Sequence, residues 1–126
     1  MAKYEICMED IINDTYGEEE IKCAITRFQR LWSAFILRDY RPGQRNDMAV
    51  DLTCVCHVLH IPVRQVIDDI WEITNDPSYL LHDIKWRVNT IEGYLDYWDD
   101  TGSNGVIAYM ISDWDRYPEE DIITLV

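Results

Sequence analysis

The stretch "CVCHVLHIPVRQVIDDIWE", from Cys54 to Glu72, decides the fold because two helical patterns meet within it at a proline. The first helix is expected to begin near Asn46, a favourable N-cap residue, and to bury Met48, Leu52, Val55, Cys56 and Leu59. Pro62 suits the first position of a second helix, whose inward residues are expected to be Val63, Val66, Ile67 and Ile70. The stretch therefore predicts two helices that are joined by a tight turn and packed as a corner.

Helical periodicity continues on the N-terminal side of this corner. The acidic run "GEEE" at 17–20 suits the positive end of a helix dipole. The helix that follows is expected to end near Tyr40, and its apolar stripe consists of Ile21, Ala24, Ile25, Phe28, Trp32 and Phe35. One face beside this stripe is basic and holds Arg27, Arg30, Arg38 and Arg41. We expect these arginines to lie near acids, either from the ends of this chain or from a second copy.

The C-terminal side of the corner also predicts helices. A long helix is expected from the spacing of Ile84, Val88, Ile91, Leu95 and Trp98, although Gly93 weakens it. After a loop at 99–105, a further helix is expected from Ile107, Met110, Ile111 and Trp114; a β-hairpin within 94–112 is the alternative. The fold class is therefore predicted to be all-α (mainly α). Residues 1–126 are expected to form a single helical domain, a compact bundle of about five to six helices with acidic N- and C-terminal segments.

Composition points to a cytoplasmic protein. No apolar run approaches the roughly 18 residues that a membrane span requires, so no membrane partner is expected. The opening "MAKYEICMED" contains acids where a signal peptide would have a basic segment followed by an apolar one. In the cytoplasm the four cysteines would be reduced thiols: Cys7, Cys23, Cys54 and Cys56.

Two cysteines and two histidines in "CVCHVLH" raise the question of a metal site. On a helix, Cys56 and His60 are i,i+4 neighbours, whereas Cys54 and His57 are i,i+3 neighbours on a different face. Structural zinc usually takes two separated pairs of ligands that converge on one point, and the chain offers no second pair. The spacing favours a structural role for these residues, so neither a metal nor another cofactor is expected.

The same segment has the pattern of a helix-turn-helix, which would suggest a transcriptional regulator. Its second helix is expected to expose Arg64 and Gln65 followed by three acids, Asp68, Asp69 and Glu72. DNA-binding proteins gain most of their non-specific affinity by neutralising phosphates, which carboxylates oppose. Direct binding of nucleic acid is therefore not expected, and the segment is better explained as a packing corner.

Catalytic motifs are missing from the sequence. It contains no GxSxG, HExxH, P-loop or GxGxxG pattern, and none of Ser33, Ser78, Ser103 or Ser112 has a histidine nearby in the chain. No catalytic residue is assigned, and a role in binding is favoured over a role as an enzyme.

The acidic charge is concentrated at the two ends of the chain. The net charge is −13; residues 1–20 hold seven acids and one base, and residues 92–126 hold nine acids and one base. In the second of these segments acids alternate with aromatic residues. We assign partner binding to Asp96, Tyr97, Trp98, Asp99, Asp100, Asp113, Trp114, Asp115, Glu119 and Glu120.

Carboxylates steer a basic partner towards a surface, and tyrosine and tryptophan provide contact area. The leading hypothesis is an inhibitor that mimics DNA and occupies a basic, nucleic-acid-binding surface of an enzyme or complex, as a phage anti-defence protein of the anti-CRISPR kind would. The composition is similar to that of small phage inhibitors of nucleic-acid enzymes. An immunity or antitoxin protein that neutralises a nuclease toxin is the alternative, and self-association is left open.

Overall fold

A computed structural model describes residues 3–12, 16–39, 41, 44–75, 84–90 and 122–126 of the chain. The elements in chain order are β1 (Tyr4–Ile6), α1 (Met8–Ile12), α2 (Glu18–Leu37), α3 (Gln44–Val58), α4 (Val63–Thr74), a helix at 84–90, and β2 (Ile123–Leu125). The predicted mainly α-helical class is confirmed, with five helices and one two-stranded sheet in the described part. The positions at which a β-hairpin was considered, 94–112, lie outside it.

α2 forms for the reasons that its sequence suggests. Three glutamates occupy its first turn, where the helix dipole favours negative charge. Five of the six residues of its apolar stripe are buried and Ile25 is half-buried; Leu31, outside the predicted stripe, is buried as well. The helix ends at Leu37, three residues before the expected end, because Arg38 adopts a left-handed conformation with φ 54°. The N–H of Asp39 donates to the carbonyl of Ala34 at 2.9 Å, which closes the last turn.

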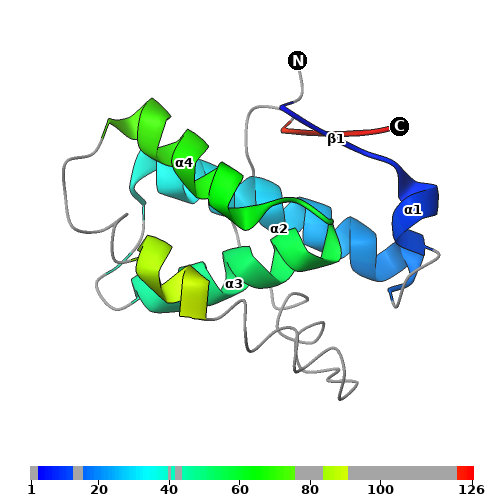
Figure 1. Cartoon of the computed structure of the whole chain (residues 1–126), viewed down its shortest axis with the longest axis horizontal. Coiled ribbons are helices and arrows are strands. Elements are labelled where there is room, and N and C mark those ends of the chain that lie inside the picture. The colour runs from blue at the N-terminus through cyan, green and yellow to red at the C-terminus, as the bar shows by residue number, and fades with distance from the viewer. Residues whose placement is uncertain (1–2, 13–15, 40, 42–43, 76–83, 91–121) are drawn as a thin grey trace.

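α3 is the central helix, and it is buried on more than one face. All residues from 51 to 56 are buried, and so are Val58 and Leu59. A helix of this kind needs neighbours all round it, and α3 packs against both α2 and α4 (Figure 1). It begins at Gln44, two residues before the expected cap Asn46, and the Gln44 side-chain oxygen accepts a hydrogen bond from the Arg41 N–H.

The corner between α3 and α4 lies where the sequence predicts it. The N–H groups of Leu59 and Ile61 donate to carbonyls in the last turn of α3, at 3.0 and 2.9 Å. His60 adopts a left-handed conformation with φ 56°, at a position where a glycine is common. Pro62 caps α4, which starts one residue later than expected, at Val63. The four predicted inward residues of α4 are all buried.

The terminal strand pair is absent from the sequence-based prediction. β1 and β2 pair in parallel, with Tyr4 opposite Ile123 and Ile6 opposite Leu125, so the two ends of the chain lie together (Figure 1). The pair is anchored by apolar residues, because Ile6, Ile122 and Ile123 are buried. The two terminal strands are therefore part of the packed structure.

The helix at 84–90 follows its predicted pattern, since Ile84 and Val88 are both buried. An ion pair between Lys85 and Asp68 connects it to α4. The later positions of the same predicted stripe lie outside the described residues. Among the described helices, none combines the length and the apolar character needed to cross a membrane.

Candidate functional site

The ten predicted partner-binding residues all lie between positions 96 and 120, outside the described part of the chain. Their assignment to partner binding stays a prediction. The described structure instead locates two buried carboxylates, one in α3 and one in α4, and a cavity beside β1.

The first carboxylate, Asp51, forms an ion pair with Arg27 between α3 and α2. The side chain of Asp51 is 1% exposed and that of Arg27 is 10% exposed, and the guanidinium Nε donates to Oδ2. The basic face of α2 was expected to meet acids from the chain ends or from a second copy. For Arg27 the acid comes from the middle of the chain. Arg38 of the same face donates to the Thr74 carbonyl at 3.4 Å, and Arg41 is exposed.

Burial makes Asp51 harder to ionise than an ordinary aspartate. Desolvation raises the pKa of Asp51 from 3.8 to about 6, although the charge and the hydrogen bond of Arg27 act in the opposite direction. The second oxygen, Oδ1, is buried and has no hydrogen-bond partner among the described residues. Asp51 is therefore ionised at neutral pH but is stabilised on one oxygen only.

The second carboxylate, Asp69, corrects a prediction, because it was expected to be exposed on α4 and is only 8% exposed. Its Oδ2 accepts a hydrogen bond from the Tyr4 hydroxyl at 2.7 Å and lies 3.4 Å from Lys3 Nζ. Its Oδ1 accepts a hydrogen bond from Gln65 Nε2 at 2.9 Å. Desolvation opposes ionisation, but the hydrogen bonds from Tyr4 and Gln65 and the charge of Lys3 outweigh it and lower the pKa of Asp69.

This carboxylate holds β1 against α4 and α2. The Tyr4 ring meets the rings of Phe28 and Trp32 edge-on, with centroid distances of 5.5 and 6.1 Å. Lys3 Nζ also lies 5.1 Å from the centre of the Trp32 ring, within the range of a cation–π contact. Burial, followed by the hydrogen bond to Asp69, raises the pKa of Tyr4, so its hydroxyl stays protonated and donates. The N-terminal strand is thus fixed by specific contacts.

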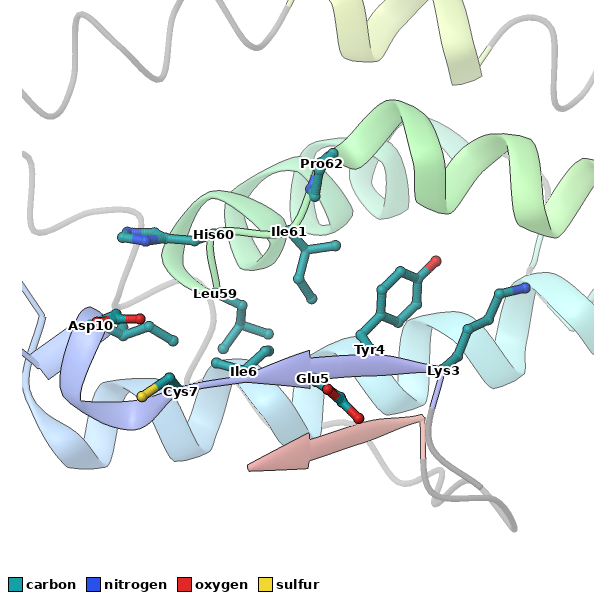
Figure 2. A pocket seen from close by; sticks show the side chains of 11 residues that line it. Lys3, Tyr4, Glu5, Ile6, Cys7, Asp10, Leu59, His60, Ile61 and Pro62 are labelled. Atoms are coloured by element: carbon teal, nitrogen blue, oxygen red, sulfur yellow. The ribbon is translucent and has the colours of Figure 1, made fainter. Parts of the chain in front are cut away.

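A cavity of about 340 Å³ lies between β1 and the α3–α4 corner (Figure 2). It is lined by residues 3–7, by Asp10 and Ile11 of α1, and by residues 59–62 of the corner. Volumes of about 300–1,000 Å³ are typical of ligand-binding pockets. This site is absent from the sequence-based prediction, because no local pattern indicates that β1 lies beside the corner. The one available signal was the alternation of apolar and charged residues in "KYEI".

The cysteines and histidines of the corner do not converge on one point. Cys54 and Cys56 are buried, His57 is half-buried and His60 is exposed. Burial and the nearby charge of Asp51 raise the pKa of the Cys54 thiol to about 12, which opposes formation of the thiolate that binds metal. Within the described ranges, no three histidine, cysteine or acidic side chains gather in a way that could hold a metal ion.

Comparisons with protein-family models, with curated proteins and with solved structures found no match for this chain. The function therefore has to be inferred from the geometry and the charge of the chain itself.

Proposed function

We propose that this protein acts by binding, and that its acidic and aromatic C-terminal segment, residues 92–121, occupies a basic nucleic-acid-binding surface of a partner. The observation that carries the proposal is the distribution of charge. The segment contains all nine acids found between residue 92 and the C-terminus, against a single base. Such an excess of one sign attracts an oppositely charged partner over long range and orients it before contact.

Ion pairs in the described structure add support, because they engage cations that could otherwise neutralise the acidic segment. Four of these cations form ion pairs between described residues: Lys3, Lys22, Arg27 and Lys85. Each of these pairs joins residues between positions 3 and 85 of the chain. These four cations belong to the more balanced central region and to the N-terminal end of the chain.

A competition experiment tests the proposal. The full chain is immobilised, proteins are captured from bacterial lysates, and the beads are washed with an excess of duplex DNA. We expect a basic nucleic-acid-binding protein to be captured and then released both by duplex DNA and by increased salt. If an excess of duplex DNA did not reduce the amount of captured protein, the result would contradict mimicry of nucleic acid. Capture and inhibition of a nuclease toxin would select the immunity alternative within the same kind of binding.

Direct DNA binding is tested with the same reagents. The exposed residues of α4 include Arg64 but also Asp68 and Glu72, and its first exposed amide, Gln65, donates to Asp69. We expect no saturable binding of duplex DNA by the protein alone at physiological salt. Tight binding that weakens steeply with salt would favour the regulator over the inhibitor.

A further inference from the structure

β1 has two edges, and only one of them is paired. The Tyr4 N–H donates to the Ile122 carbonyl at 2.9 Å, and the Val126 N–H donates to the Ile6 carbonyl at 2.8 Å. Tyr4 and Ile6 therefore direct their backbone groups towards β2. Neighbouring residues of a strand direct these groups to opposite edges, so the N–H and C=O of Glu5 point away from β2. Within the described part of the chain, neither group has a backbone partner.

The cavity runs along this unpaired edge. All five residues from 3 to 7 line it, although successive side chains of a strand point to opposite faces. Five consecutive residues can border one cavity only where the backbone itself forms the wall. No residue of β2 lines the cavity, which lies on the side of β1 away from β2 (Figure 2). Figure 2 shows the corner residues 59–62 on the other side of the space.

The lining combines an apolar floor with an acidic rim. Four apolar side chains of the lining are buried: Ile6, Ile11, Leu59 and Ile61. Glu5 and Asp10 also line the cavity and are exposed, so they contribute two negative charges to it; in Figure 2 the Glu5 side chain points away from the corner. Lys3 is the one lysine of the lining. It pairs with Asp69 and lies over the Trp32 ring, so it does not neutralise Glu5 and Asp10.

We propose that the unpaired edge of β1 binds an extended segment of a partner protein, which adds a strand beside Glu5 and places a lysine or arginine side chain near Glu5 and Asp10. In strand addition, main-chain hydrogen bonds provide affinity and side-chain pockets provide specificity. β1 has three residues, which span roughly 10 Å, so the segment is short. The proposal uses none of residues 92–121, and it stands or falls independently of the proposed function.

The test uses a capped, fluorescent pentapeptide of alternating valine and lysine and the full-length protein, with binding measured by anisotropy. We expect saturable binding, and we expect the variant carrying Glu5→Lys and Asp10→Lys to bind at least about tenfold more weakly. The matched control carries Glu9→Lys and Glu72→Lys, two exposed acids outside the cavity lining, and is expected to keep the wild-type affinity. Equal weakening in both variants would reduce the effect to net charge and overturn the proposal.

Two further measurements leave the protein unaltered. A peptide with alternate backbone amides methylated loses the hydrogen bonds of an added strand and is expected to bind about tenfold more weakly. Bound peptide is expected to slow alkylation of Cys7, which lines the cavity, and to leave that of Cys23 on α2 unchanged. Equal binding of the methylated peptide, or equal protection of both thiols, would contradict strand addition. A concentration-dependent dimer that already protects the Glu5 amide from hydrogen exchange would identify a second copy as the occupant and overturn the proposal.

Discussion

Asp51 in α3 and Asp69 in α4 are both buried carboxylates, and each faces a cation, yet their pKa values move in opposite directions. One oxygen of Asp51 accepts a hydrogen bond from Arg27, and the other has no hydrogen-bond partner among the described residues. Asp69 accepts hydrogen bonds on both oxygens and retains some contact with solvent, with its side chain 12% exposed. The difference shows that one cation does not offset full desolvation, whereas several donors to a less buried carboxylate do.

The largest expected effect comes from removing the cation that faces Asp51. Arg27→Met leaves a buried carboxylate without its counter-charge, and we expect a loss of about 3–5 kcal/mol in the free energy of unfolding at pH 7. Urea denaturation measures the loss, and Arg41→Met, at an exposed arginine, is the control. Adding Asp51→Leu to Arg27→Met should recover most of the stability. A loss below about 1 kcal/mol in the single variant would show that Asp51 is not desolvated as described.

The pH dependence of stability should be next in size. The folded pKa of Asp51, about 6, is above its ordinary value of 3.8, so the fold favours the protonated form. This contribution is fully present below the unfolded pKa and is lost as the pH rises through about 6. Between pH 4 and pH 7, wild-type stability should fall by about 2 kcal/mol more than that of Asp51→Asn. If the curves of stability against pH were parallel for the two proteins, Asp51 would not be the titrating group.

The donors to Asp69 should contribute less, and with the opposite dependence on pH. Tyr4→Phe removes one hydrogen bond to a charged acceptor, and we expect a loss of about 1.5 kcal/mol at pH 7. Because the folded pKa of Asp69 is lowered, its stabilisation is present above the unfolded value and is lost as the pH falls through the folded pKa. NMR titration of the carboxyl carbon should show a higher pKa for Asp69 in Tyr4→Phe. An unchanged pKa would mean that the hydroxyl does not donate to Asp69.

Exposed ion pairs should produce the smallest effect. Lys22 pairs with Glu18 at 3.3 Å, with the two side chains 55% and 60% exposed, and Lys85 pairs with Asp68 at a similar level of exposure. Solvent screens both pairs, so Lys22→Ala and Lys85→Ala should each cost about 0–1 kcal/mol, less at high salt. Thermal unfolding at low and high salt checks this. A loss of stability as large as that expected for Arg27→Met would contradict the view that buried ion pairs contribute more than exposed ones.

α2, α3, α4 and the helix at 84–90 could be predicted from the sequence because their apolar residues recur with the helical period, whereas the five-residue helix α1 was not predicted. Pro62 marks the corner, and the buried residues of α2 and α4 follow the helical period. Residues 92–121 lie outside the described structure, so for them the sequence remains the only guide.

The long-range contacts could not be predicted in the same way. β1 and β2 have three residues each and lie at opposite ends of the chain, so neither has a recognisable pattern alone. Asp69 was assigned to an exposed face because its partner Tyr4 is 65 residues away. The cavity depends on the same contact, since it brings β1 beside the corner.

Charge reversal in the C-terminal segment tests the central claim most directly. Asp96, Asp99 and Asp100 are changed to lysine, and the affinity for the captured partner is compared with that of a control carrying Glu9→Lys, Asp47→Lys and Glu72→Lys, at three exposed acids of α1, α3 and α4. Circular dichroism verifies that both variants are folded. The account predicts that the first variant loses partner binding and that the control keeps it, because only the first places like charges against the basic surface. Equal loss in both, or no loss in the first, would contradict a binding face in residues 92–121.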